Sequence, residues 1–259
     1  MTGSFELLNP KVQKFIINEL KWNKLTEVQE VTIPHVLAGK NIIALAPTAG
    51  GKTESVFFPI LSSIDNEKLE GISTLYISPI KALLNNQEIR LKKLSKSIYR
   101  DAFKWHGDVT KSQKTKFYNQ PCSILMITPE SLEVMLLSKT LDKDHLFSQL
   151  RFVVVDEIHS FAAGDRGSHL ISVLERLQTY SKYDIQRLGL SATVGNPNMI
   201  GTWLKGSSKR KGVVIDPDIK KSKKKLNIFF YKREDEFTTD IYRNFADKKT
   251  LFFVNGRRD

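Results

Sequence analysis

The stretch that most limits the fold of this chain is Asn41–Glu54, which reads NIIALAPTAGGKTE. It opens with an apolar run that is long enough for a strand buried on both faces. The run stops at the loop PTAGG, and a helix-compatible segment then continues to Ile64. This order, a strand, then a glycine-bearing loop, then a helix, is the structural context that distinguishes a phosphate-binding loop from a chance match to its motif. We therefore predict a nucleotide site here, and the alternative is a glycine-rich turn without function.

The residue types in this loop suit phosphate chemistry. Small residues allow backbone N–H groups to close around phosphate oxygens, and the start of the following helix adds its positive dipole end. Lys52 is expected to reach the β- and γ-phosphates, and the Thr53 hydroxyl to hold Mg²⁺. The general pattern GxxxxGK[ST] is met as AxxxxGKT, because Ala46 occupies the position of the first glycine. The predicted ATP-binding residues of the loop are Thr48, Ala49, Gly50, Gly51, Lys52, Thr53 and Glu54.

Predicted strands and helices alternate along most of the chain. Strands are expected at 42–46, 72–78, 102–105, 123–127, 151–155 and 186–190, and helices at 54–64, 80–98, 129–137, 169–180 and 199–204, with two more within 5–37 and a polar helix after Asp108. This alternation predicts an α/β fold with a doubly wound, mostly parallel sheet and helices on both faces. The right-handed crossover rule then places the polar loops at one edge of the sheet, where the strands end.

The charge and cysteine content limit the class of binding partner and the cellular compartment that we expect. The 259 residues carry a formal charge of +12, which favours a polyanionic partner, nucleic acid before a membrane. Many basic proteins bind no polyanion, so charge alone leaves this open. The single cysteine, Cys122, excludes an internal disulfide and predicts a reducing, cytoplasmic location. We see no signal peptide and no apolar run near the roughly 18 residues that a membrane helix needs, so we expect no membrane partner.

The lysine-rich segment 207–225 marks a change in composition. Two interpretations remain for it: contacts with phosphates, or a solvated linker. Beyond it, strands are expected at 226–231 and 250–254, and we interpret them as the opening of a second domain. We therefore predict a first domain over 1–220, with its leading helices in 1–40, and a linker with a truncated second domain over 221–259.

A second polar motif follows the hydrophobic strand FVVV. Because Asp156 and Glu157 come directly after it, they are expected at the same sheet edge as the phosphate loop. Asp156 would hold Mg²⁺, usually through water, and Glu157 would orient or deprotonate the attacking water. A third motif, Ser191-Ala192-Thr193, ends the next predicted strand, and its hydroxyls would hydrogen-bond the carboxylates or His159. Alone, this triplet is equally typical of a helix cap.

The motifs GKT, DEIH and SAT, in this order, resemble motifs I, II and III of superfamily 2 helicases. The large helicase-related type is the most similar subgroup, through ISPIKALLNNQ, WHGDV, ITPESLEVML, VVDEIHSF, DRGSHL and LSATVGNP. The resemblance spans nearly the whole chain, since the closing KTLFFVNGRRD is similar to motif IV at the start of a second RecA-like domain. It implies a RecA-like P-loop NTPase fold. The chain departs from the family at Ala49-Gly50, and this change keeps the loop small.

The resemblance also implies a role for each motif residue. The residues implied in catalysis are Lys52, Glu157, His159, Ser191 and Thr193, and those implied in Mg²⁺ binding are Thr53 and Asp156. Adenine would be recognised by Phe5, Thr26 and Gln29. The nucleic-acid backbone would be contacted by Pro79, Lys81, Thr128, Pro129 and Arg166. Two alternatives stay open. Phe5, like Trp22, either stacks on adenine or joins helices, and Arg166 with Gly167 either touches nucleic acid or forms a turn with a solvated arginine.

The implied function is an ATP-dependent helicase or translocase that binds Mg-ATP and tracks the backbone of single-stranded nucleic acid without sequence preference. DNA is favoured over RNA, and the expected partner is a second RecA-like domain of the same full-length protein. The chain stops at the motif IV-like segment, so we expect it to lack the arginines of the second domain and to be nearly inactive alone. Two alternatives remain: a P-loop kinase or NTPase of another class, and a non-catalytic nucleic-acid-binding module.

Overall fold

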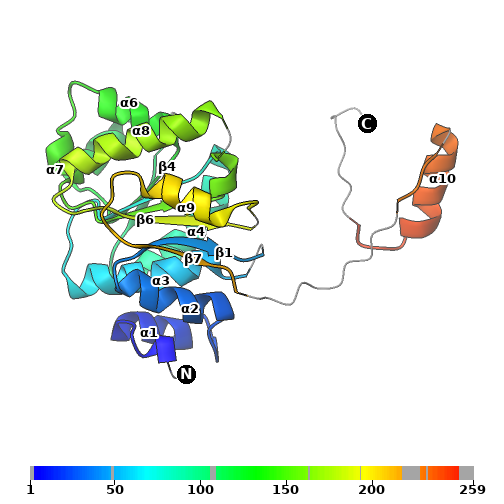
Figure 1. The fold of residues 1–259 in the computed structure, drawn as a ribbon, viewed down its shortest axis with the longest axis horizontal. Helices are drawn as coiled ribbons and strands as arrows, with labels where there is room; N and C mark the ends of the chain where they lie inside the picture. Colours follow the sequence, from blue (N-terminus) through cyan, green and yellow to red (C-terminus); the bar gives the residue numbers. More distant parts are fainter. Residues whose placement is uncertain are drawn as a thin grey trace. The chain divides into compact units, whose positions relative to one another are not determined.

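Seven strands form one sheet in the computed structural model, and every neighbouring pair of strands is parallel (Figure 1). The strands lie in the order β3-β4-β2-β5-β6-β1-β7. Their bounds are β1 Asn41–Leu45, β2 Thr74–Ile77, β3 Ala102–Lys104, β4 Ile124–Ile127, β5 Phe152–Val155, β6 Gln186–Ser191 and β7 Gly212–Ile215. The structure describes residues 3–47, 50–105, 109–162, 164–192, 194–217, 228–231 and 233–250.

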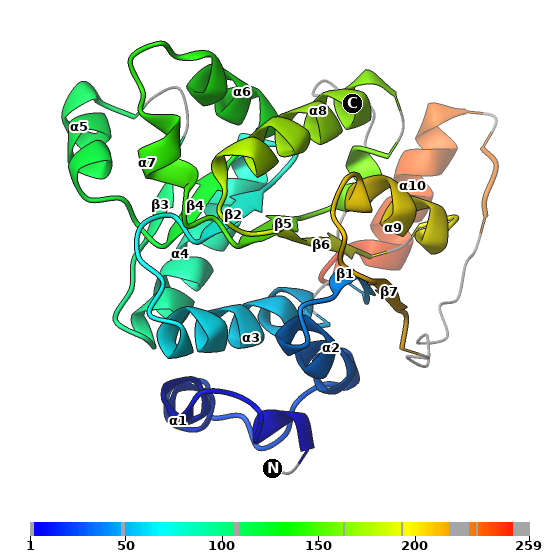
Figure 2. The ribbon, with the colours of Figure 1, turned by 60° about the vertical axis from the view of Figure 1, so that its left-hand side comes forward.

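Helices cover both faces of this sheet (Figure 2). One face packs against α1 Pro10–Asn18, α2 Glu27–Leu37, α3 Lys52–Asn66 and α4 Lys81–Lys96, and the other against α5 Lys111–Asn119, α6 Pro129–Leu137, α7 Lys143–Phe147, α8 Asp165–Tyr180 and α9 Pro197–Lys205. Short 3-10 turns lie at Gly3–Phe5 and Ile158–Ser160, and α10 spans Glu234–Phe245. The expected α/β fold with a parallel sheet and helices on both faces is confirmed.

The apolar strands explain this layered arrangement. All four residues of β2, β4 and β5 are buried, as expected of parallel strands that are covered on both faces. Successive side chains of a strand point to opposite faces, so Ile42 and Ala44 join one core cluster while Ile43 and Leu45 join the other. The sheet is therefore held by two hydrophobic layers, one on each side.

The strand register brings the polar motifs to one edge. The last residues of β1 and β6, Leu45 and Ser191, are register partners, and so are the last residues of β2 and β5, Ile77 and Val155. Within each pair, the two parallel strands therefore end at the same level on one side of the sheet. Strands β5, β6 and β1 are neighbours in the sheet. Asp156 follows β5, Ser191 ends β6 and the phosphate loop follows β1. This is the edge that the crossover rule predicts, and we call it the carboxyl edge.

Several predicted elements differ from the structure. Helix α8 begins at Asp165 rather than at residue 169, because the glycine within DRGSHL does not interrupt it. The interpretation of 207–225 as a linker is wrong for Gly212–Ile215, which pair with β1 as the edge strand β7. Ile228–Tyr231 form no strand, and the end of the strand expected at 250–254 lies outside the described residues. Neither α7 nor α10 is in the predicted set.

The chain divides into two compact units, Met1–Ile219 and Lys220–Asp259. The first contains the whole sheet. In the second, the described part carries α10, and Phe230 and Tyr242 are largely exposed. Among the described helices, none combines the length and the apolar character that crossing a membrane requires.

Candidate nucleotide site and nucleic-acid face

The phosphate loop connects β1 to α3, and its two described glycines are required by its geometry. Gly51 has a φ of +85°, a left-handed conformation that glycine adopts readily, and a Cβ there would meet Gln29 Nε2 at 2.5 Å. A Cβ on Gly50 would lie 2.9 Å from the Pro47 carbonyl oxygen. The loop therefore needs glycine at both positions. Thr48 and Ala49, which were also assigned to the nucleotide site, lie outside the described residues.

Lys52 is the first residue of α3, and its side chain points back over the loop. Its ammonium group donates to the carbonyl oxygens of Ala46 and of Pro47, the latter at 3.0 Å. Only 9% of the residue is exposed. Burial lowers the pKa of this ammonium, and the negative charges of Glu157 and Asp156 oppose that shift. The negative charges of two carboxylates thus act on a buried cation, in the place where phosphates would be bound.

Asp156 follows β5 directly and is held by two donors. The Tyr76 hydroxyl donates to its Oδ2, and the backbone N–H of Glu157 donates to its Oδ1 at 3.0 Å. Glu157 adopts a φ of +45°, which is uncommon outside glycine and is concentrated at functional sites. Tyr76 is fully buried, and burial together with the Asp156 charge raises its pKa well above the usual value. The phenol therefore stays protonated and donates to the carboxylate.

Tyr76 was not predicted from the sequence. It belongs to the apolar run of β2, and nothing near it in the chain indicates a partner 80 residues away. The available signal is weak, since it amounts to the rule that a buried tyrosine hydroxyl usually finds a hydrogen-bond partner. The pairing of β2 with β5, which brings the two side chains together, is seen only in the structure.

Glu54 was predicted to contact the nucleotide, and the structure places it in a buried ion pair. Arg90 of α4 donates from both Nε and Nη2 to the two carboxylate oxygens of Glu54. The Glu54 side chain is 6% exposed and that of Arg90 is 39% exposed. This pair joins the first turn of α3 to α4, and the role of Glu54 in nucleotide binding stays a prediction. The sequence contains no signal for Arg90, because the pairing spans two helices.

His159 and Ser191 connect the second and third motifs. Their side chains lie 2.8 Å apart, from His159 Nδ1 to Ser191 Oγ, and His159 Nδ1 lies 3.4 Å from Glu157 Oε2. The structure thus brings together three of the residues assigned to catalysis. Thr193, the remaining member of the SAT triplet, lies outside the described residues.

Thr26 and Gln29 at the start of α2 reach the phosphate loop. Gln29 is fully buried, accepts from the Thr26 backbone N–H at 3.0 Å and donates to the Gly51 carbonyl at 3.3 Å. The Thr26 hydroxyl donates to the Gly50 carbonyl at 3.3 Å. Phe5 is buried in the core cluster with α1 to α4, and Trp22 packs edge-on against Phe58. The packing of both rings favours the interpretation that they join helices.

The residues assigned to nucleic acid divide into exposed and buried sets. Arg166 lies in the first turn of α8, so it belongs to a helix and not to an irregular turn, and its contact with nucleic acid stays a prediction. Its guanidinium donates to the Pro79 carbonyl at 2.7 Å and to Glu130 Oε1 at 2.8 Å, which ties the loop after β2 to the start of α6. Lys81, the first residue of α4, is also exposed.

The buried set is held at the same edge. Thr128 caps α6, since its hydroxyl oxygen accepts from the Ser131 backbone N–H at 3.4 Å. Pro129 opens that helix, and it is buried together with Thr128 and Pro79. These three residues position the backbone of two loops, while the side chains of Lys81 and Arg166 are exposed.

The donor set around the phosphate loop fits magnesium and a triphosphate. Mg²⁺ is usually held by one or two protein oxygens, substrate phosphates and water. The Asp156 carboxylate and the Thr53 hydroxyl supply oxygen donors, and the loop supplies backbone N–H groups and Lys52. Within the described residues, no three or more His, Cys, Asp or Glu side chains are grouped to hold a metal ion by themselves. The arrangement is suited to a metal that arrives with phosphates.

Comparison with known proteins identifies similar sequences. Residues 26–200 match the model of the DEAD/DEAH box helicase family. The ATP-dependent helicase Lhr-Core of Methanocaldococcus jannaschii is 32% identical over 98% of this chain and 32% of its own length. Lhr-Core of Methanothermobacter thermautotrophicus is 33% identical over 81% of this chain and 26% of its own length. The chain therefore spans about a third or less of these curated relatives.

Solved structures with the same fold are also found. The helicase Lhr of Mycobacterium smegmatis, bound to ssDNA and AMP-PNP, has a TM-score of 0.74 at 28% identity over 83% of this chain and 28% of its own. The DUF1998 helicase MrfA has a TM-score of 0.76 at 25% identity over 98% of this chain and 39% of its own.

Proposed function

This chain belongs to the DEAD/DEAH box helicase family, and we propose that it is the ATP-binding motor domain of a helicase that moves along nucleic acid. The observation that carries the proposal is that the loop after β1, with Lys52, and the carboxylates after β5, Asp156 and Glu157, follow strands that end at the same edge of the sheet. We also propose that residues 1–220 are the first RecA-like domain and that 221–259 begin a second one, in agreement with the division of the chain at residue 220.

Each side chain of the carboxyl edge has a defined task in this proposal. The Lys52 ammonium leaves the loop carbonyls to contact the β- and γ-phosphates of ATP. Thr53 and Asp156 hold Mg²⁺, which neutralises charge on the phosphate oxygens when it is bound. The Glu157 carboxylate orients the attacking water and accepts its proton. The contact of His159 with Ser191 transmits the state of this carboxylate to the loop after β6.

Single-stranded nucleic acid, with DNA before RNA, is the proposed substrate. The M. smegmatis relative was solved with ssDNA. Lys81 and Arg166 supply positive charge on the exposed part of the same edge. Contacts with phosphates carry no sequence information, so we expect binding that is independent of sequence and weakens with salt.

The proposed partner is a second RecA-like domain. In the helicases that this chain resembles, ATP lies between two such domains, and the second supplies arginines to the transferring phosphoryl group. The relatives are about three times as long as this chain, which leaves room for that domain. An arginine supplied in this way is worth roughly 10³ to 10⁵ in rate.

Steady-state ATP hydrolysis by the full-length protein tests the proposal. The assay compares a single-stranded DNA, a single-stranded RNA of the same length and no nucleic acid, each with and without Mg²⁺. We expect hydrolysis that needs Mg²⁺ and rises most with DNA. A stronger response to RNA would reassign the substrate. Transfer of the phosphoryl group to an acceptor other than water would contradict the helicase assignment.

A further inference from the structure

The end of the sheet opposite the carboxyl edge carries a second distinctive surface. Helix α4 begins at Lys81 on the carboxyl edge and runs for 16 residues, about 24 Å. The turn that follows it leads to β3, which starts at Ala102 on the opposite edge. This end of the sheet holds none of the helicase motifs, and we call it the amino edge.

Tyr99 in this turn has an uncommon backbone for its residue type. The Arg100 N–H donates to the Ser95 carbonyl at 3.1 Å and the Tyr99 N–H to the Lys96 carbonyl at 3.0 Å, the two bonds of a Schellman motif. Glycine usually occupies the left-handed position of this motif, whereas Tyr99 adopts it with a φ of +59°. Its side chain is 86% exposed. The chain accepts a conformational cost here and presents an aromatic ring to solvent.

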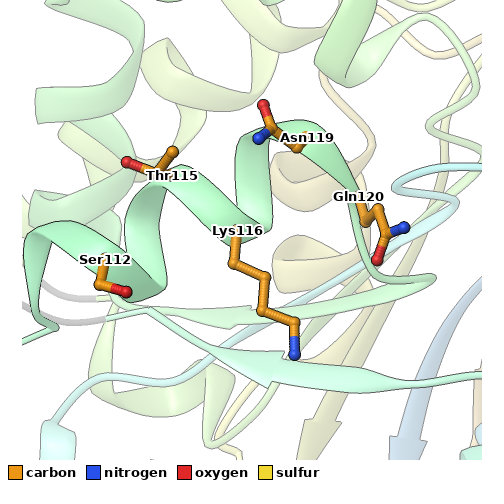
Figure 3. A pocket seen from close by; sticks show the side chains of 5 residues that line it. All are labelled: Ser112, Thr115, Lys116, Asn119 and Gln120. Atoms are coloured by element: carbon orange, nitrogen blue, oxygen red, sulfur yellow. The ribbon is translucent and has the colours of Figure 1, made fainter.

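Three hollows lie in a row around this ring. One, of about 580 Å³, lies between α1 and the end of α4, and it shares Lys96 and Tyr99 with a second of about 480 Å³ between α4 and α5. The second shares Lys116 and Gln120 with a third of about 580 Å³ along α5. Figure 3 shows the third, where the Lys116 side chain extends from α5 between Ser112 and Gln120. The hollows form a continuous track, and Tyr99 stands between the first two.

Positive charge lines this track. Lys14, Lys93, Lys96, Arg100 and Lys116 border it, and among the described residues none of the five forms an ion pair with a carboxylate. Only two acidic residues, Glu19 and Asp101, line the same hollows. Helix ends favour basic residues through the dipole, which accounts for Lys93 and Lys96 in the last turn of α4 and for Lys116 in the last turn of α5. It does not account for Lys14 and Arg100, which lie outside the last turn of any helix.

We propose that this surface binds a single-stranded nucleic acid, with the Tyr99 ring stacked on a base and the surrounding cations on the phosphates. Aromatic rings within a cationic groove are the usual means of holding single strands without sequence preference. A duplex offers no free base face to Tyr99, so the exposed ring favours the single strand. The proposal goes beyond the motor function, because the surface lies at the opposite edge from the motifs.

Photo-crosslinking on the full-length protein tests the location. A bromodeoxyuridine-substituted 20-mer is irradiated with the protein, and adducts are mapped by mass spectrometry. We expect adducts on the peptide that contains Tyr99 in addition to those near Lys81 and Arg166. Adducts at the carboxyl edge alone would overturn this inference and leave the proposed function intact. Adducts at Tyr99 alone would support it and contradict the motor assignment of the motif edge.

Substitution of Tyr99 tests the stacking. Tyr99→Gly relaxes the turn and removes the ring, and we expect single-strand affinity to fall by about 5-fold or more, whereas Tyr99→Phe keeps the ring and the affinity. The matched control is Lys68→Gly, because Lys68 also has a positive φ, of +54°, in an exposed turn. Equal losses for Tyr99→Gly and Lys68→Gly, or for Tyr99→Gly and Tyr99→Phe, would contradict stacking.

The cations are tested by salt dependence. Replacing Lys96, Arg100 and Lys116 together by alanine should lower the log–log salt slope for a single strand by about 2, at roughly 0.7 for each phosphate contact. Replacing Lys24, Lys139 and Lys182, three exposed lysines elsewhere, should leave the slope unchanged. A loss confined to duplex DNA would overturn the single-strand proposal.

Discussion

The two edges of the sheet use charge in opposite ways. At the carboxyl edge, Lys52 is 9% exposed and its ammonium group contacts backbone carbonyls, and Glu54 is paired with Arg90. At the amino edge, Lys96 and Arg100 have no acidic partner among the described residues, and the ring of Tyr99 between them is 86% exposed. The same fold therefore contains a preorganised, partly buried cluster and an open, unpaired one.

This difference follows from the ligands that each edge would bind. A triphosphate is compact and highly charged, so its site benefits from groups that are already oriented and from a low local dielectric. A nucleic-acid strand is long and flexible, and its phosphates are bound by cations that stay in water and release counterions. Substitutions of the charged groups at the carboxyl edge should therefore affect stability and chemistry together, and substitutions of the exposed cations at the amino edge should affect affinity alone.

The largest expected effect is that of Glu157→Gln on turnover. Glutamine keeps the shape of the side chain but cannot accept a proton from water, so ATP hydrolysis by the full-length protein should fall by roughly 10² to 10⁴. Binding of a fluorescent ATP analogue should remain near that of the parent. Hydrolysis at the parental rate would show that Glu157 is not the catalytic base, and it would weaken the contrast between a catalytic carboxyl edge and a binding amino edge.

Lys52→Ala should reduce the affinity for ATP by about 100-fold, because a charged contact with the phosphates is lost. Titration with the fluorescent analogue measures this, and urea unfolding reports whether the Ala46 and Pro47 carbonyls, which lose their donor, destabilise the chain. Lys116→Ala is the control at the amino edge and should leave ATP affinity unchanged. An equal loss of ATP affinity for Lys52→Ala and Lys116→Ala would contradict the assignment of the nucleotide site to the carboxyl edge.

Glu54→Gln should lower the free energy of unfolding by about 2 kcal/mol, since Arg90 loses its counter-charge next to the buried α3. The value is below that of a fully buried pair because the Arg90 side chain is 39% exposed. Adding Arg90→Gln completes a double-mutant cycle in urea. The exposed pair of Arg233 with Asp235, whose side chains are 68% and 67% exposed, is the control, with an expected cost below about 1 kcal/mol. Strict additivity of Glu54→Gln and Arg90→Gln would show that the two residues do not interact.

Tyr76→Phe should cost about 1.5 kcal/mol in unfolding free energy, because the buried Asp156 carboxylate loses one of the two donors that the described residues supply, while the ring volume stays the same. Without that donor the carboxylate is less well oriented, so we also expect nucleotide binding to need more Mg²⁺. Tyr183→Phe, whose hydroxyl reaches the side chain of Gln149 rather than a carboxylate, serves as control. An unchanged Mg²⁺ requirement would limit Tyr76 to a structural role.

The smallest expected effect lies beneath the amino edge, at Cys122. Burial raises the pKa of this thiol from 9.0 to about 12. The unfolded chain therefore releases the proton first, and the stabilising contribution of the thiol, fully present below pH 9, is lost as pH rises from 9 towards 12. Relative to Cys122→Ala, the parent should lose about 1 kcal/mol of stability between pH 9 and 10. Parallel pH curves in urea would indicate that this thiol ionises freely.

Local patterns in the sequence were sufficient for the parts of the fold that depend on neighbouring residues. The strand–loop–helix at the phosphate loop and the strand before Asp156 follow from apolar runs, glycines and charged residues that are close in the chain. The gathering of the phosphate loop, Asp156 and Ser191 at one edge also follows, because parallel strands with right-handed crossovers end on the same side. Strand β7 is not predicted from the sequence, because its four residues lie within a lysine-rich segment whose composition is typical of a solvated linker.

Only the tertiary structure decided which side chains meet across elements. Tyr76 contacts Asp156 across 80 positions, and Arg90 contacts Glu54 across 36. Hydrophobic periodicity indicates that a residue is buried, but the strand order and register determine what lies opposite it. The exposure of Tyr99 is also decided by the tertiary structure, because no local pattern indicates that this ring lies on the surface. Sequence determines the chemistry that the chain carries, and packing determines which of those groups act together.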